Sequence, residues 1–353
     1  MTTNQRPIRV LVVDDSPLIQ KILTRGISKD PTLEVIGVAM DPYQARDLIV
    51  QLNPDVMTLD IEMPRMNGLE FLRRLIPNYP MPVIMVSTLS QEGAQITFDC
   101  LAAGAMDFVC KPSGGQSGDT ESMLADLRDK IHAVVHGRPS RPATAPPAQT
   151  PAAPAVKIIG ATHKLIALGA STGGTEATRK VLRQLPPQIP GMLIVQHMPP
   201  GFTKAYADRL NSECAIEVRE AVHGDILHPG LALLAPGGLH MSVRRQGGEY
   251  RVSCQDGDKV NWHCPSVDVM MDSVAAHAGK MATGIILTGM GNDGAKGLLA
   301  MRQAGARTMA QDEETSVVFG MPKVAFDCGG AEKLYAIDRI APALLELLSA
   351  TIS

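Results

Sequence analysis

Aromatic residues, basic surface and long apolar runs are all scarce in this chain of 353 residues. Only 3% of the residues are aromatic, with a single tryptophan, which argues against a platform for stacking nucleic-acid bases. The formal net charge of −3 provides no overall attraction to nucleic acid or to an anionic membrane. No apolar run approaches the ~20 residues of a membrane span, and the N-terminal MTTNQRPIRV lacks the apolar stretch of a signal peptide. We therefore expect a cytoplasmic protein that neither binds nucleic acid nor inserts into a membrane.

The chain also lacks any C-x-x-C pair. Its scattered cysteines indicate buried or isolated thiols rather than metal ligands or disulfides. They are Cys100, Cys110, Cys214, Cys254, Cys264 and Cys328.

One break in composition divides the chain. Residues 137–155 read GRPSRPATAPPAQTPAAPA, a Pro- and Ala-rich stretch without hydrophobic periodicity, which is typical of an extended linker. At roughly 150 residues per domain, the length also favours two domains. We predict an N-terminal domain over 1–135, a linker over 136–158 and a C-terminal domain over 159–353.

The N-terminal part alternates short apolar runs with helical patterns. Ser16-Pro17 and Asp41-Pro42 each combine a helix N-cap with a proline at the first helical position. Five strands alternating with helices predict an α/β fold with a doubly wound, five-stranded parallel sheet. The clearest apolar runs are IRVLVV (8–13), VMTLD (56–60), PVIMVS (82–87) and AMDFVC (105–110).

The C-terminal part begins in the same way. Apolar strands at 165–169, 192–196 and 284–289 each lead into a helical pattern. Between them, residues 216–256 contain shorter β-like runs with Gly and Pro turns. The pattern predicts a second α/β domain whose mostly parallel sheet is interrupted by an antiparallel excursion.

Charged side chains follow several strands of the N-terminal sheet. Asp14 and Asp15 end the first strand, Asp60 ends the third, Ser87 the fourth and Lys111 the fifth. Because the carboxyl ends of parallel strands share one edge, these groups should converge. Three carboxylates suit Mg²⁺, and a lysine and a hydroxyl beside them suit a phosphoryl group, although any single Asp here could be a helix cap.

The segments VLVVDDS, LDIEMPRMNG, PVIMVS and FVCKP resemble a response-regulator receiver domain over residues 7–133. The resemblance implies a flavodoxin-like fold in which a histidine-kinase partner phosphorylates Asp60, and Ser87 and Lys111 sense the phosphoryl group. It further implies that Mg²⁺ binds to oxygens of Asp14, Asp15, Asp60 and the Glu62 main chain.

Three further strand ends bring together residues of a different chemistry. Ser171 lies in Gly169-Ala-Ser-Thr-Gly173 between a strand and a helix, the context of a nucleophile elbow. His197 follows the next strand and Asp293 follows a later one, so the three form a hypothetical catalytic triad. Two alternatives remain: the first loop could cradle a phosphate, and Gly289-x-Gly291-x-x-Gly294 formally matches a dinucleotide fingerprint.

The segments LIALGASTGGTEA, VQHMPPGFT, PSVDVMMDSVA and ILTGMGNDGA resemble the catalytic domain of chemotaxis protein-glutamate methylesterases. The resemblance implies that Ser171 is the nucleophile, His197 the general base and acid, and Asp293 the residue that orients the histidine. It suggests Thr172 and Met290 as oxyanion-side residues. This chain departs from many relatives by having Trp262 and Cys264 where they carry arginines.

The leading hypothesis is a phosphorylation-activated serine hydrolase that demethylates glutamate methyl esters on the cytoplasmic helices of chemoreceptors and deamidates glutamines there. Mg²⁺ would serve phosphorylation, and hydrolysis would need no cofactor. A receiver-controlled binding protein without hydrolase activity, and a nucleotide-dependent oxidoreductase, are the alternatives.

Overall fold

The computed structural model describes residues 6–88, 90–111, 117–137 and 161–349. The chain forms two compact units, Met1–Pro146 and Pro147–Ser353. The predicted linker over 136–158 lies almost wholly outside the described residues, so the predicted domain boundaries stay predictions. Within the described ranges, no helix is both long enough and apolar enough to cross a membrane.

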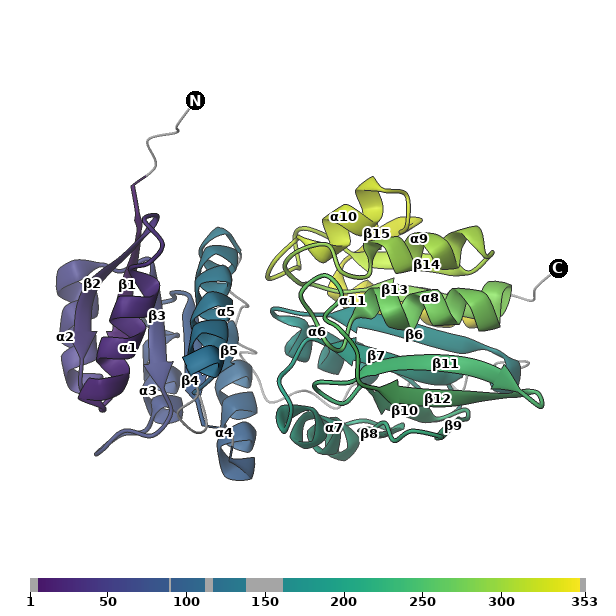
Figure 1. The fold of residues 1–353 in the computed structure, drawn as a ribbon, viewed down its shortest axis with the longest axis horizontal. Helices are drawn as coiled ribbons and strands as arrows, with labels where there is room; N and C mark the ends of the chain where they lie inside the picture. The colour runs from purple at the N-terminus through teal and green to yellow at the C-terminus, as the bar shows by residue number, and fades with distance from the viewer. Residues whose placement is uncertain (1–5, 89, 112–116, 138–160, 350–353) are drawn as a thin grey trace. The chain divides into compact units, whose positions relative to one another are not determined.

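The N-terminal unit is a five-stranded parallel sheet with helices on both faces (Figure 1). The strand order β2-β1-β3-β4-β5 is that of a flavodoxin-like, doubly wound fold, which confirms the prediction. Its elements are β1 (Ile8–Val13), α1 (Pro17–Ile27), β2 (Leu33–Ala39), α2 (Pro42–Leu52), β3 (Val56–Asp60), α3 (Gly68–Leu75), β4 (Val83–Ser87), α4 (Gln91–Ala102), β5 (Asp107–Cys110) and α5 (Ser117–His136).

Local signals in the sequence account for where these helices begin. The Ser16 hydroxyl accepts a hydrogen bond from the Ile19 amide at the start of α1, and the Asp41 carboxylate accepts two from amides of α2. Proline at the first helical position fits both helices because its missing N–H would have had no helical partner.

The C-terminal unit contains a seven-stranded sheet and a smaller three-stranded sheet. The large sheet is parallel throughout, in the order β15-β14-β13-β6-β7-β10-β8. Its elements are η1 (Ala161–His163), β6 (Leu165–Ala170), α6 (Gly174–Leu182), β7 (Gly191–Gln196), α7 (Phe202–Glu213), β8 (Glu217–Glu220), β9 (Ile226–Leu227), β10 (Leu231–Leu234), β11 (His240–Gln246), β12 (Glu249–Gln255), α8 (Val267–Ala278), η2 (Gly279–Met281), β13 (Ala282–Ile286), α9 (Ala295–Gln303), β14 (Arg307–Gln311), α10 (Met321–Asp327), β15 (Lys333–Tyr335) and α11 (Ile337–Ser349).

The predicted antiparallel excursion is confirmed, with a finer division than the sequence suggested. Strands β8 and β10 join the parallel sheet at its edge, whereas β11 and β12 pair antiparallel with each other and with β9. Helix α8 packs against β11 and α9, and α6 packs against α11 (Figure 1). Every residue of β6 and β7 is buried, as expected for central parallel strands covered on both faces.

Strand β6 lies between β13 and β7, and this order brings the candidate catalytic residues to one edge. Ala170, the last residue of β6, pairs with Gln196, the last residue of β7. On the other side Gly169 pairs with Ile286 of β13. The chain therefore leaves all three strands at the same carboxyl edge, where ligand sites of open α/β sheets form.

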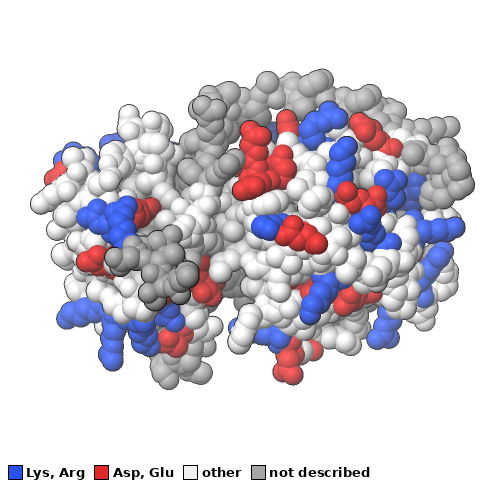
Figure 2. Space-filling model, turned by 90° about the horizontal axis from the view of Figure 1, so that it is seen from above, with Lys and Arg blue, Asp and Glu red and all other residues white. Residues whose placement is uncertain are grey.

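Basic and acidic side chains are interspersed on the face of the molecule shown in Figure 2. Among the residues that the structure describes, lysine and arginine form no continuous stripe on that face. The surface on this side agrees with the small net charge of −3.

Candidate active site and candidate metal centre

The Ser171 loop is held from both neighbouring strands. The Ser171 amide donates to the carbonyl of Thr288, beyond β13, at 3.0 Å. The Ser171 carbonyl accepts from the Gln196 side chain, at the end of β7, at 2.9 Å. A Cβ on Gly289 would lie 2.8 Å from the Ser171 Cβ and 2.3 Å from the Met321 sulfur, so only glycine allows this approach. These main-chain contacts therefore fix the position of Ser171 without any hydrogen bond from its side chain.

The turn at Ser171 differs from the elbow that the G-x-S-x-G pattern predicts. In α/β-hydrolases the serine itself occupies the strained position. Here the left-handed residue is Gly173, with φ of +75°, and Ser171 is not among the described residues with positive φ. A Cβ on Gly173 would come within 2.5 Å of the Val317 side chain, so glycine is required there for space as well as for conformation.

His197 and Asp293 form the hydrogen bond that a triad requires. Nε2 of His197 lies 2.8 Å from Oδ2 of Asp293, and both side chains are nearly inaccessible, at 6% and 1% exposed. The His197 amide donates to the carbonyl of Ala170, which fastens the histidine to β6. The structure thus brings His197 and Asp293 together and places His197 beside the strand that precedes Ser171, and the triad itself stays a prediction.

Asp293 also caps helix α8. Its carboxylate accepts hydrogen bonds from the main-chain amides of Val267 (2.6 Å) and Asp268 (3.2 Å) at the helix N-terminus. The Ser266 hydroxyl and the Asn261 side chain donate to the same carboxylate at 2.8 and 2.7 Å. Burial opposes ionisation, but the hydrogen bond and charge of His197, together with these other donors, hold the pKa of Asp293 well below its usual value. The carboxylate is thus ready to stabilise an imidazolium.

The other nitrogen of His197 is buried and free of hydrogen bonds within the described residues. Because Nε2 is bonded to an ionised carboxylate, it carries the proton, and Nδ1 is left as the basic nitrogen. Among the described residues, the buried Nδ1 has no hydrogen-bond partner. Contacts between a nucleophile and its base are often long in substrate-free structures and shorten in the complex.

Sequence reasoning missed the contributions of Asn261 and His263. The His263 ring stacks on the His197 ring with centroids 3.6 Å apart and planes inclined by 12°. Asn261 donates to both Asp268 and Asp293, at 2.7 Å each. The only sequence signal for these two residues was that they lie just before the PSVD segment, residues 265–268. The contact from Asn261 to Asp293 joins residues about thirty positions apart, and such a contact leaves no local pattern in the sequence.

The two residues suggested for the oxyanion side lie in different surroundings. Thr172 is buried, and its carbonyl accepts from the Thr288 hydroxyl at 2.9 Å. Met290 is 37% exposed. Helix α6 begins at Gly174 without a side-chain cap, which leaves main-chain amides at its N-terminus as anion-stabilising donors.

The glycines of the dinucleotide-like motif have packing roles in this loop. Gly289 makes room for Ser171, as described above, and a Cβ on Gly294 would lie 2.6 Å from the Val267 side chain. Asp293 directs its carboxylate at the α8 N-terminus within the same loop. This geometry explains the motif without a bound nucleotide.

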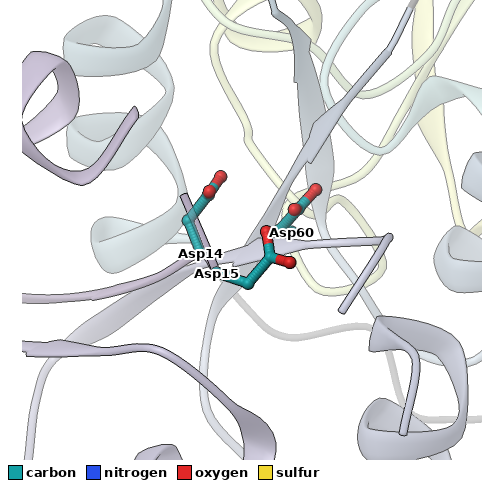
Figure 3. Close-up of side chains that lie close together, drawn as sticks. All are labelled: Asp14, Asp15 and Asp60. Carbon is teal, nitrogen blue, oxygen red and sulfur yellow. The ribbon is translucent and has the colours of Figure 1, made fainter. Parts of the chain in front are cut away.

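The second cluster lies at the carboxyl edge of the N-terminal sheet. Asp14, Asp15 and Asp60 each offer a carboxylate oxygen, and these atoms lie within 4.8 Å of one another (Figure 3). Asp14 and Asp60 are buried and Asp15 is exposed. A small oxygen-only donor set that remains partly open to solvent fits Mg²⁺, which usually retains several waters.

Lys111 joins this cluster, as its position after β5 predicts. Its ammonium nitrogen lies 2.9 Å from oxygens of both Asp14 and Asp60. Burial raises the pKa of Asp60 to about 6, and the bond and charge of Lys111 offset only part of that effect. Burial works against the charge of Lys111 too, but its bonds to Asp60 and Asp14 raise its pKa.

Ser87 and Glu62 lie near the cluster without a contact that tests their expected roles. Ser87 is fully buried, and its hydroxyl accepts from Thr97 at 2.8 Å. Its carbonyl accepts from the Lys111 amide at 2.7 Å, so the two predicted sensing residues share a main-chain bond. Glu62 is exposed two residues beyond Asp60. All six cysteines are free thiols in the structure.

The fold and the candidate sites together point to a class: a receiver joined to an α/β hydrolase unit with a candidate serine site. Comparison with known proteins agrees, because residues 10–118 match the family model for the response regulator receiver domain and residues 166–344 match that for the CheB methylesterase. The chain belongs to the CheB methylesterase family.

Its relatives share the whole architecture. A protein-glutamate methylesterase/protein-glutamine glutaminase of Syntrophotalea carbinolica is 54% identical, and the match covers 98% of each chain. A protein of the same name from Pectobacterium atrosepticum is 50% identical over 97% of each chain. The crystal structure of the Thermotoga maritima CheB methylesterase catalytic domain is 38% identical, with a TM-score of 0.51, and covers 52% of this chain and 98% of that one.

Proposed function

We propose that this chain is a phosphorylation-activated serine hydrolase that cleaves methyl esters of glutamate side chains on chemoreceptors and deamidates receptor glutamines. The observation that carries the proposal is the His197–Asp293 hydrogen bond at the strand edge from which Ser171 emerges. The names of the full-length relatives support the same reaction. Acting on cytoplasmic receptor helices would place the protein in the cytoplasm.

The reaction begins with attack of Ser171 Oγ on the ester carbonyl. Nδ1 of His197 accepts the hydroxyl proton, and Asp293 stabilises the imidazolium through Nε2. The tetrahedral intermediate then expels the methoxy oxygen, which takes the proton from His197 and leaves as methanol. A glutamine would follow the same path and release ammonia.

Water completes the reaction on the glutamyl ester of Ser171. His197 removes a proton from the water as it attacks, then returns a proton to Ser171 Oγ as the acyl bond breaks. The glutamate carboxylate leaves and the enzyme is regenerated. Main-chain amides near Thr172, Met290 and the α6 N-terminus would stabilise the oxyanion in both halves.

Asp60 would serve as phosphoryl acceptor in the N-terminal unit, with a histidine kinase as donor. Oxygens of Asp14, Asp15, Asp60 and the Glu62 main chain would hold Mg²⁺, which neutralises charge on the transferred phosphoryl group when bound. Lys111 would then pair with the phosphoryl oxygens, and Ser87 would contact them after its hydroxyl rotates away from Thr97.

Methanol release from methylated receptor membranes tests the proposal directly. The wild-type chain should release methanol, faster with a small phosphodonor and Mg²⁺ than without. Ser171→Ala should lose activity by several orders of magnitude. Asp60→Asn should keep the basal rate but lose the stimulation.

Two outcomes would contradict the proposal in different ways. Near-normal release by a folded Ser171→Ala variant would exclude the serine mechanism. Full stimulation of Asp60→Asn by the phosphodonor would exclude Asp60 as the acceptor. Circular dichroism of both variants provides the control for folding.

A further inference from the structure

The only tryptophan in the chain lies beside the triad, almost fully exposed. Trp262 has 88% of its surface accessible to solvent, the largest value among the exposed large apolar residues of the described ranges. An indole is mostly apolar, and leaving it in water forgoes the burial that normally stabilises such a residue. The fold therefore gains little from the Trp262 side chain.

The main chain at Trp262 is unfavourable as well. Val260 and His263 pair through two main-chain hydrogen bonds, of 3.0 and 2.9 Å, and enclose a two-residue turn. Asn261 and Trp262 have φ of +50° and +70°, the signature of a type I′ turn. Asparagine is common at the first of these positions, but the second favours glycine, and a bulky side chain there is rare. Such strain is typical of functional positions.

Both neighbours of Trp262 are fastened to catalytic residues. Asn261 donates to the Asp293 carboxylate at 2.7 Å, and His263 stacks on the His197 ring at 3.6 Å. The turn is therefore a rigid projection anchored at the active site, with the tryptophan at its apex. When the glutamyl side chain of a protein substrate reaches Ser171, the main chain and adjoining side chains of that substrate must pass over this turn.

We propose that Trp262 contacts the protein substrate, packing its indole against the receptor helix that presents the glutamate methyl ester. This inference rests on the proposed function. A methylated glutamate is neutral, so an apolar and aromatic contact suits it better than a charged one would. Continuity with the catalytic residues favours the substrate as the occupant over other surfaces.

Kinetics with a soluble, methylated cytoplasmic fragment of a chemoreceptor provide the first test. Trp262→Ala in the full-length chain should raise KM by about 10- to 30-fold, the effect of losing an aromatic anchor, and leave kcat within about twofold. Trp262→Phe should recover most of the affinity. Ile226→Ala is the matched control, because Ile226 is an exposed apolar residue of β9 whose neighbour Leu227 packs on Gly191, at the opposite end of β7.

Thermal stability provides a second test, because the same substitution should raise stability while it weakens substrate binding. Trp262→Gly removes the strain of a left-handed tryptophan, so the melting temperature of the C-terminal unit should rise by about 1–4 °C while KM still rises. A structural role would lower both stability and activity. An unchanged KM in Trp262→Ala and Trp262→Gly would overturn the proposal.

Fluorescence separates this inference from the proposed function. With one tryptophan in the chain, all tryptophan emission comes from Trp262. In the Ser171→Ala variant, the methylated fragment should shift this emission to shorter wavelength. No shift would refute the contact even if the wild type releases methanol, and a shift without methanol release by the wild type would refute only the hydrolase. Emission that responds to a phosphodonor with Mg²⁺ but not to the fragment would assign Trp262 to the receiver and overturn the inference.

Discussion

Replacing Asp293 with asparagine should unfold the catalytic unit more easily as well as stop catalysis. The carboxylate accepts hydrogen bonds on both oxygens: from Asn261, Ser266 and the Asp268 amide on one, and from His197 and the Val267 amide on the other. Asparagine has a single acceptor oxygen, and its NH₂ group must face one of these sets of donors. Whichever orientation it takes, at least one main-chain amide of α8 loses its partner.

The magnitude follows from the number of orphaned donors. The side-chain donors can reorient but the main-chain amide cannot, so one orphaned amide at about 1–3 kcal/mol, with up to about 1 kcal/mol from removing negative charge at a helix N-terminus, destabilises the unit by about 2–4 kcal/mol. At about 2–4 °C per kcal/mol for a unit of this size, its melting temperature should fall by about 4–16 °C. Hydrolysis should fall by about 10⁴-fold, because His197 would adopt the wrong tautomer.

Differential scanning calorimetry of the full-length protein measures the stability effect. The transition of the C-terminal unit should move and that of the receiver should stay. Ser171→Ala is the control, since its missing hydroxyl has no hydrogen bond to lose among the described residues and its transition should stay within about 0.5 kcal/mol of wild type. An inactive Asp293→Asn protein with an unchanged transition would refute the dual role of this carboxylate.

Three further predictions concern other groups. Because burial raises the pKa of Asp60 to about 6, above the unfolded value near 3.8, the receiver should be stabilised below about pH 4 and lose that stability as the pH rises through 6. Asp60→Asn should abolish that loss and raise the receiver's stability at pH 7.5 by at most about 3 kcal/mol, measured by calorimetry; a variant no more stable than wild type would contradict the burial argument. His263→Ala should lower kcat for methanol release about tenfold while His263→Phe retains most activity, and equal rates for both variants would exclude stacking as the function of His263. Gly289→Ala should displace Ser171 and reduce kcat at least 100-fold, whereas activity near wild type would show that the loop yields to the 2.8 Å contact.

Strand positions were predictable from the sequence because each central strand is a continuous apolar run. The runs at 8–13 and 56–60 coincide with β1 (Ile8–Val13) and β3 (Val56–Asp60). The helix starts at Ser16 and Asp41 were equally readable, since a cap and a proline act locally. The pairing of short strands was not readable. Strands β8 and β10 have four residues each, too few to distinguish a parallel partner from an antiparallel one.

The candidate catalytic site was predictable at the strand ends and not beyond them. Ser171, His197 and Asp293 follow apolar strands, so the sheet itself brings them to one edge. The roles of Asn261 and Ser266 depend on a loop folding back onto Asp293, and a serine before a helix has the same appearance whether or not it also supports a carboxylate. The pattern around Ser171 did not specify which residue takes the left-handed conformation, and in the structure that residue is Gly173.

The register of two strands has a consequence for protein design. Ser171 and His197 each come one residue after a directly paired couple, Ala170 and Gln196, so their spacing is a property of the sheet rather than of flexible side chains. The basic nitrogen, Nδ1, is also the ring nitrogen nearer the main chain, so side-chain rotation displaces it less than it would displace Nε2. The pair is therefore transferable in principle to any parallel sheet with two adjacent strands of matched length. A third strand leading to a helix N-terminus would supply the carboxylate that orients the histidine. The designer would need to specify the backbone positions before the side-chain rotamers.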